Sequence, residues 1–169
     1  MKSTLILGGA RSGKSRRAQQ LAEQLCATRV FIATAEALDQ EMADRIARHQ
    51  QDRGVGWHTV EAPLDLVTAL EEAAARQACL LVDCLTLWLS NLMHHGRDVE
   101  AESTALCDLL RRLECPVILV SNEVGLGLVP ETALGRAFRD AQGRLNQQVA
   151  EACDVVEFVA AGLPLRLKG

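Results

Sequence analysis

Residues 5–15 read LILGGARSGKS, and this stretch decides the fold. An apolar run at residues 4–9 leads directly into glycines, and the segment from Gly8 to Ser15 fits the phosphate-loop pattern G-x-x-x-x-G-K-[ST]. In such a loop successive backbone N–H groups point into one concavity, and the following helix adds its positive N-terminal end. The stretch predicts a nucleotide-binding turn between a first strand and a first helix. The plain alternative is a glycine-rich turn that only joins them.

Three side chains are expected to bind the phosphates or the magnesium ion that accompanies them. Lys14 would reach the outer phosphates as a point charge, and the Ser15 hydroxyl would ligate Mg²⁺. A carboxylate partner for the metal is expected at the end of a neighbouring strand, and Asp83 in LLVDC (80–84) supplies it. On its own, Asp83 could instead cap a helix that follows the strand.

The rest of the chain alternates short apolar runs with helical patterns. The runs are rich in Val, Leu and Ile, which is typical of parallel strands covered on both faces. Strands are predicted at 4–9, 29–34, 79–84, 116–122 and 154–160, with a further or edge strand at 57–61; helices are predicted at 14–27, 36–51, 63–77, 99–114 and 133–153. This order predicts one α/β domain over residues 1–169, a mostly parallel sheet flanked by helices.

Composition argues against a nucleic-acid-binding protein, a membrane protein and a cysteine metal site. The net charge of −4 gives no electrostatic footprint for nucleic acid, and no apolar run approaches the roughly 20 residues of a membrane span. The six cysteines are scattered without metal-like spacing, so we expect reduced thiols that pack as small hydrophobes. The cytoplasm is the expected compartment.

The segment RIARHQQDR (45–53) carries His49 between arginines. A neutral imidazole is a good nucleophile toward phosphorus near pH 7, and Arg48 and Arg53 would neutralise the phosphorus oxygens. Attack on an α-phosphate would expel pyrophosphate and leave a phosphoramidate. On spacing alone, a solvated histidine at a helix end is the simpler interpretation.

Two polar groups follow the strand predicted at 116–122. Asn122 and Glu123 open a glycine-containing loop that forms either a flexible turn or a mobile wall of the site. Arg136, Asp140 and Arg144 lie four residues apart on the next helix, where they form either an exposed ladder of ion pairs or a phosphate contact.

The combination of motifs is more specific than the phosphate loop alone. The chain contains R-I-x-x-H at 45–49, W-x-T-x-E at 57–61, L-T-x-W-x-x-N-L at 85–92 and S-N-E-V-G at 121–125. With the phosphate loop, these blocks resemble the bifunctional adenosylcobinamide kinase / adenosylcobinamide-phosphate guanylyltransferase family, in family order and over nearly the whole chain. The phosphate loop without these blocks would fit a small-molecule kinase lacking guanylyltransferase activity.

The resemblance implies a cytoplasmic enzyme of cobalamin biosynthesis with a P-loop, RecA-like sheet and a homotrimeric assembly. One activity phosphorylates adenosylcobinamide with ATP or GTP. The other transfers GMP from GTP to adenosylcobinamide phosphate through a GMP-histidine intermediate, giving adenosylcobinamide-GDP and pyrophosphate. His49 stands at the position of the nucleophile. Arg53 precedes Gly54, where the family often has Arg-Pro.

The resemblance also implies a set of nucleotide-contacting residues. They fall into the phosphate loop, the end of the second strand, the residues after His49 and two acidic positions, with Ser15 and Asp83 as Mg²⁺ ligands. The full set is Gly8, Gly9, Ala10, Arg11, Ser12, Gly13, Lys14, Ser15, Ala33, Thr34, Ala35, Gln50, Gln51, Asp52, Arg53, Glu61 and Asp83.

Overall fold

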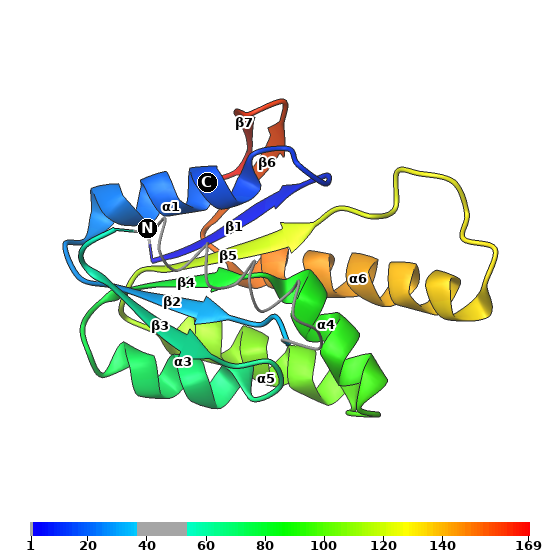
Figure 1. Cartoon of the computed structure of the whole chain (residues 1–169), viewed down its shortest axis with the longest axis horizontal. Helices are drawn as coiled ribbons and strands as arrows, with labels where there is room; N and C mark the ends of the chain where they lie inside the picture. The colour runs from blue at the N-terminus through cyan, green and yellow to red at the C-terminus, as the bar shows by residue number, and fades with distance from the viewer. Residues whose placement is uncertain (1, 37–53) are drawn as a thin grey trace.

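A computed structural model describes residues 2–36 and 54–169 of the chain (Figure 1). Strands and helices alternate along it as the sequence predicts. In order, the elements are β1 (Ser3–Gly8), α1 (Lys14–Leu25), β2 (Arg29–Ala33), β3 (Trp57–Glu61), α3 (Leu66–Ala74), β4 (Cys79–Asp83), α4 (Leu85–His94), α5 (Val99–Arg112), β5 (Val117–Asn122), α6 (Ala133–Ala152), β6 (Val155–Ala160) and β7 (Leu163–Lys168). Most of the helix predicted at 36–51 lies outside the described residues.

The described strands form one sheet in the order β3-β2-β4-β5-β1-β6-β7. Every neighbouring pair is parallel except β6 and β7, which are antiparallel. Strand β5 therefore lies between β1, which leads into the phosphate loop, and β4, which ends at Asp83. The predicted α/β fold with a mostly parallel, RecA-like sheet is confirmed.

Helices cover both faces of the sheet (Figure 1). Helix α1 packs on one face, where the core includes Ile6, Leu21, Leu81 and Ile118. Helices α3, α4, α5 and α6 cover the other face, around Trp88 and many leucines. Successive strand residues point to opposite faces, so a strand with both faces covered must be apolar throughout. This explains the unbroken apolar runs.

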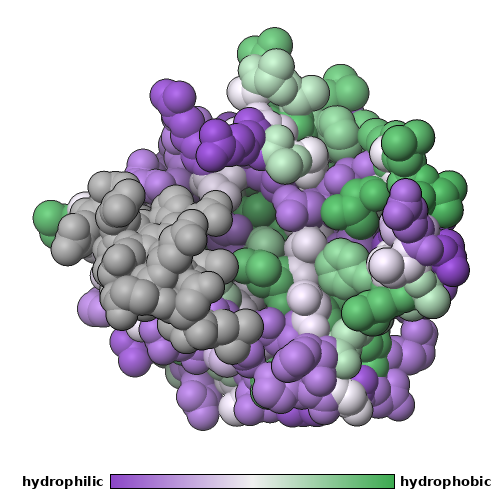
Figure 2. Space-filling view, turned by 45° about the vertical axis from the view of Figure 1, so that its right-hand side comes forward, coloured by the Kyte–Doolittle hydropathy of each residue, from purple (hydrophilic) through white to green (hydrophobic). Residues whose placement is uncertain are grey.

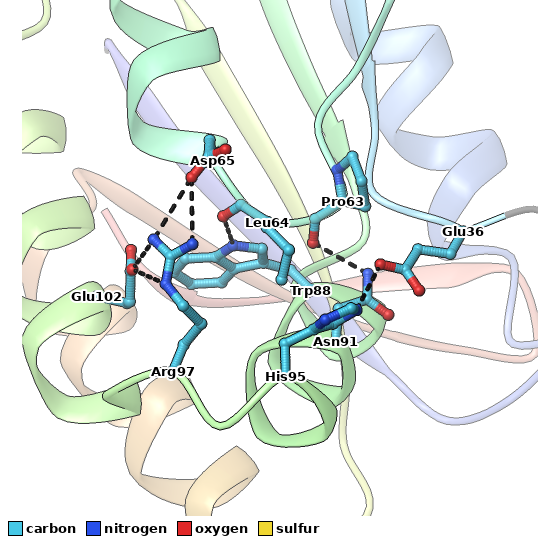
Figure 3. Close-up of polar contacts among 9 residues, drawn as sticks. All are labelled: Glu36, Pro63, Leu64, Asp65, Trp88, Asn91, His95, Arg97 and Glu102. Atoms are coloured by element: carbon cyan, nitrogen blue, oxygen red, sulfur yellow. Dashed lines mark hydrogen bonds and ion pairs between the residues drawn. The ribbon is translucent and has the colours of Figure 1, made fainter.

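Three features differ from the sequence predictions. Strand β7 and helix α4 were not predicted as elements, and α3 begins at Leu66 rather than at Pro63. The late start of α3 has a visible cause (Figure 3). The carbonyl oxygens of Pro63 and Leu64 accept hydrogen bonds from the side chains of Asn91 and Trp88 on α4, at 3.0 and 2.8 Å.

The described residues include no helix with the length and apolar character that a bilayer span requires. All six cysteines are free thiols, four of them buried. The thiol packing expected from their scattered positions is confirmed.

Candidate nucleotide-binding site

The phosphate loop joins β1 to α1 and leaves the start of the helix open to an anion. Gly13 is the N-cap residue of α1, with φ of 100°, and the helix has neither a side-chain cap nor an acidic residue in its first turn. Arg11 also has a positive φ, 55°. The uncapped N–H groups and the helix dipole both favour a bound phosphate here.

The loop rests on the turn between β6 and β7, which lies beside it in Figure 1. The N–H of Gly162 donates to the carbonyl oxygen of Ser12 at 2.8 Å. A Cβ atom on Gly8 would collide with the carbonyl oxygen of Val159, and one on Gly13 would lie 3.1 Å from the Cα of Gly162. Gly8 is therefore favoured by close approach to strand β6, and Gly13 by close approach to the turn.

Lys14 is buried in the loop, with 7% of its surface exposed. Its ammonium group donates to the carbonyl oxygen of Gly9 at 2.6 Å. Burial lowers the pKa of Lys14, and the negative charge of Asp83 opposes this shift by raising the pKa. The carboxylate of Asp83 is therefore close enough to Lys14 to act on its charge, and its predicted role as a Mg²⁺ ligand stays a prediction.

Three of the predicted nucleotide contacts lie in one row across the sheet. Ala33 pairs with Glu61 of β3 on one side and with Asp83 of β4 on the other. Because the strands are parallel, all three residues lie at the carboxyl edge, which is also the edge of the phosphate loop. Glu61 is exposed and Asp83 is half-buried.

A hydrogen-bond cluster fixes the end of β2. The Thr34 hydroxyl donates to the carbonyl oxygen of Cys84 at 2.7 Å and accepts from the Cys84 N–H at 2.8 Å. The Asn91 side-chain amide donates both to the Thr34 carbonyl at 2.8 Å and to that of Pro63 (Figure 3). Asn91 thus ties the ends of β2 and β3 to helix α4. Asn91 was not among the predicted site residues, although it lies in the L-T-x-W-x-x-N-L block.

The chemistry of the donors suits a magnesium ion shared with a nucleotide. Ser15 is exposed in the first turn of α1, and its hydroxyl and the Asp83 carboxylate are the oxygen ligands that Mg²⁺ prefers. Among the described residues, no cluster of three or more His, Cys, Asp or Glu side chains could hold a metal ion. Mg²⁺ usually takes one or two protein ligands and completes its shell with phosphates and water, so this sparse set fits.

His49, Gln50, Gln51, Asp52 and Arg53 lie outside the described residues, so their predicted roles stay predictions. The chain entering this segment is tied to α4. The Glu36 carboxylate lies at hydrogen-bond distance, 3.0 Å, from Nε2 of His95 (Figure 3). His58 and His94 are exposed, and neither is bonded to a carboxylate in the described part of the chain.

The end of β5 holds a second polar cluster. The Asn122 N–H donates to the Thr86 hydroxyl at 2.8 Å, and the Asn122 carbonyl accepts from the side-chain amide of Asn146 on α6 at 3.0 Å. Glu123 folds back onto its own loop and accepts from the N–H groups of Gly125 and Leu126. Glu123 therefore shapes the loop.

The ladder of ion pairs considered for α6 does not form. Arg136 donates to the carbonyl oxygens of Pro130 and Glu131, and Asp140 pairs with its neighbour Arg139 at 3.7 Å. Arg136 therefore ties the loop after β5 to the start of α6. Arg144 is exposed and has no ion pair within the described residues.

The β6–β7 hairpin is fixed to both helix layers. Glu157, almost fully buried, makes two hydrogen bonds with the Arg17 guanidinium of α1, at 2.8 and 2.9 Å, and a third with Arg166. The Lys168 ammonium donates to the carbonyl oxygens of Ala150, Glu151 and Cys153 at the end of α6. Strand β6 is thus bonded to α1, and strand β7 is bonded to the end of α6.

Comparisons with known proteins agree with this geometry. Residues 4–167 match the family described as "Cobinamide kinase / cobinamide phosphate guanyltransferase". The bifunctional adenosylcobalamin biosynthesis protein CobP of Pseudomonas aeruginosa is 50% identical, over 98% of this chain and 96% of that protein. The protein CobU of Escherichia coli, described in the same words, is 38% identical over 97% of this chain and 98% of its own length.

Among solved structures, the flagellar accessory protein FlaH of Methanocaldococcus jannaschii is similar with a TM-score of 0.60 and 14% identity, covering 99% of this chain and 78% of that one. At this identity the likeness concerns the fold alone. The sequence matches are the stronger finding because they span nearly the whole chain. The chain belongs to the cobinamide kinase / cobinamide phosphate guanyltransferase family, and it is an enzyme with these two activities.

Proposed function

We propose that the enzyme phosphorylates adenosylcobinamide with ATP or GTP and then transfers GMP from GTP to the phosphate it has made. The observation that carries this proposal is the carboxyl edge of the sheet. There the uncapped N-terminus of α1, buried Lys14 and half-buried Asp83 lie at the same edge of the sheet, and their chemistry suits a nucleoside triphosphate. Mg²⁺, held by Ser15 and Asp83, would neutralise charge on the transferring phosphate.

The second reaction is proposed to use His49 as a covalent carrier. The imidazole nitrogen attacks the α-phosphorus of GTP, an N–P bond forms, and the bond to the β-phosphate oxygen breaks to release pyrophosphate. An oxygen of adenosylcobinamide phosphate then attacks the same phosphorus and displaces the histidine, giving adenosylcobinamide-GDP. Gln50, Gln51, Asp52 and Arg53 would seat the nucleotide beside the histidine, with Ala33, Thr34, Ala35 and Glu61.

Labelling with GTP that carries phosphorus-32 at the α-phosphate tests this step. Wild-type protein should acquire an acid-labile, base-stable label, and His49→Ala should acquire none. His58→Ala is the matched control, because His58 is exposed on β3, and it should label like wild type. Labelling of His49→Ala would contradict the proposal. If wild type is unlabelled but still phosphorylates adenosylcobinamide, the enzyme is a kinase without guanylyltransferase activity.

We also propose a homotrimer that works in the cytoplasm. Leu163, Leu165 and Leu167 of β7 are more than half exposed, as are Leu126, Leu128, Val129 and Leu134 around the loop after β5. Figure 2 shows apolar atoms gathered at the top and along the right-hand side of this view. Exposed apolar groups on this scale are typical of protein interfaces, and free, buried thiols suit a reducing compartment.

Sedimentation equilibrium tests the assembly, since each chain has a mass of 18.4 kDa. Wild type should sediment at three times this mass. Replacing Leu165 with Lys should lower the mass if β7 lies in the interface, and Lys at exposed Gln147 on α6 serves as the control. A monomeric wild type would contradict the assembly without affecting the assignment of the two reactions.

A further inference from the structure

The end of β5 lies between the two strands that carry the parts of the proposed nucleotide site. In the sheet β5 is inserted between β1 and β4, and Asn122 is paired in register with Gly8, the first residue of the phosphate loop. Two residues earlier on β5, Val120 is paired with Asp83. Asn122 is therefore the strand residue that lies between the phosphate loop and the carboxylate proposed to bind magnesium.

The side chain of Asn122 belongs to the face of the sheet that carries α1. Ile118 and Val120 pack in the core beneath α1, whereas the Ser121 hydroxyl bonds to α6 on the opposite face. Side chains alternate along a strand, so Asn122 continues the row of Ile118 and Val120. This is the face on which Lys14 is buried at the start of α1.

The backbone of Asn122 is held on both sides. Thr86 of α4 accepts from its N–H and Asn146 of α6 donates to its carbonyl, while the next N–H, that of Glu123, donates to the Gly8 carbonyl at 3.0 Å. Asn146 is held in turn by Gln142, a fully buried residue that donates to it at 2.9 Å. Two helices and the phosphate loop therefore fix the position from which this side chain projects.

The carboxamide itself is left available. Both of the hydrogen bonds that the structure gives to Asn122 use its main chain, and across residues 2–36 and 54–169 its half-buried side chain bonds to no other group. A neutral amide offers two N–H donors without adding to the negative charge of Asp83. A donor that is fixed in advance and aimed at developing or existing negative charge needs no reorganisation during the reaction.

We propose that the side-chain amide of Asn122 donates a hydrogen bond to the terminal phosphate of the nucleoside triphosphate in the phosphate loop. This inference rests on the proposed function of that loop and adds a residue to it. A contact restricted to the terminal phosphate distinguishes a triphosphate from a diphosphate. Asn122 then serves both to favour the substrate nucleotide over its product and to orient the phosphate that is transferred.

Calorimetric titration with Mg²⁺ and either ADP or the non-hydrolysable β,γ-imido analogue of ATP tests this inference. In Asn122→Ala the affinity for the triphosphate analogue should fall about ten- to a hundredfold, the usual effect of losing a hydrogen bond to a charged group. The affinity for ADP should stay within about twofold of wild type. An equal loss for both nucleotides, or no loss for either, would overturn the proposal.

Asn122→Asp provides a second variant of the same shape, in case Asn122→Ala fails to fold. It replaces the donor with a carboxylate, so its affinity for the triphosphate analogue should fall at least as much as that of Asn122→Ala. If Asn122→Asp discriminates between the triphosphate analogue and ADP as well as wild type does, Asn122 is not the donor. Gln147→Ala, exposed on α6, is the control and should match wild type. If wild-type protein binds neither nucleotide, the phosphate-loop assignment itself fails, which is a different result.

Discussion

The ammonium group of Lys14 is bonded to the carbonyl oxygen of Gly9, five residues earlier, at 2.6 Å. The cation of the phosphate loop is therefore held by the backbone of its own loop. A nucleotide must offer phosphate oxygens that replace this bond, and an ionised phosphate is a better acceptor than a neutral carbonyl. The buried ammonium group of Lys14 therefore has a hydrogen-bond acceptor before nucleotide binds, and it can exchange this acceptor for a phosphate oxygen.

Lys14→Met should abolish most triphosphate binding while leaving the fold intact. Methionine fills similar space without a charge, and burial already disfavours the charged form of Lys14, as its lowered pKa shows. We expect a loss of affinity of about a hundredfold by calorimetry, because a charge-assisted bond to phosphate disappears, with an unchanged or higher melting temperature. Unaltered affinity would remove Lys14 from the site. Lys2→Met, exposed at the start of β1, is the control.

Gly8→Ala should destabilise the protein, whereas Gly9→Ala should not. The added Cβ at position 8 would meet the Val159 carbonyl oxygen, a main-chain atom that moves only with its strand. At position 9 there is nothing within 4 Å of the added atom. We expect a cost of about 2 kcal/mol or more for Gly8→Ala, the usual range for overpacking, measured by urea unfolding. Equal stability of the two variants would contradict this account of the loop.

Glu157→Gln should remove part of the acid sensitivity of the fold. The hydrogen bond from Arg17 lowers the pKa of Glu157 from its usual 4.5, against the effect of burial, and Arg166 adds to the lowering. A carboxylate with a lowered pKa stabilises the fold above its unfolded pKa, and this contribution is lost as the pH falls through the folded pKa.

Above about pH 5, Glu157→Gln should be less stable than wild type by about 3 kcal/mol, because it leaves Arg17 without its buried partner. Below pH 4 the difference in unfolding free energy between the two proteins should become smaller. Urea unfolding of both proteins between pH 3 and pH 7 measures it. Glu114→Gln changes an exposed carboxylate and should follow wild type at every pH; a constant gap for Glu157→Gln would contradict the pKa argument.

Asn91→Leu should loosen the edge that carries the nucleotide contacts. Two carbonyl groups, those of Thr34 and Pro63, lose their donor, at a cost of about 2 kcal/mol for two hydrogen bonds. We also expect weaker nucleotide binding, since Ala33–Ala35 is no longer tied to α4. Thermal unfolding and calorimetry measure the two effects. Ser90→Ala, exposed on the same helix, is the control, and wild-type behaviour of Asn91→Leu would show that the bridge is dispensable.

Asp83→Asn should separate metal use from nucleotide binding. Without the carboxylate the kinase reaction should need a higher Mg²⁺ concentration and should slow by at least about a hundredfold, whereas ATP binding without metal should be retained, because a repulsive charge is gone. Steady-state rates against Mg²⁺ concentration measure the first effect. Asp108→Asn, an exposed change on α5, is the control. An unchanged Mg²⁺ requirement would exclude Asp83 as a ligand.

Local patterns in the sequence were enough to predict the strand and the helix on either side of the phosphate loop. The loop depends on neighbouring residues, from Gly8 to Ser15, and the strands β1, β4 and β5 are each a mostly apolar run. The row of Ala33, Glu61 and Asp83 could not be predicted, because parallel pairing brings the strand ends to one edge without fixing which residues are paired.

Strand β7 and the bridge of Asn91 could not be predicted in this way. Residues 163–168 read LPLRLK, and a proline with exposed leucines is not typical of an inner strand. The strand forms because β6 offers an edge and because Arg166 and Lys168 find partners on β6 and at the end of α6. The alternation of Ile118, Val120 and Asn122 was a usable signal for the orientation of Asn122.

The support of the phosphate loop by the β6–β7 turn has a consequence for synthesis on the ribosome. Ser12 is translated early, yet the Gly162 N–H that bonds to it follows about 150 residues later. The nascent chain displays the nucleotide-binding motif long before the surface beneath it exists. We therefore expect high affinity for nucleotide only after β6 and β7 have emerged from the exit tunnel.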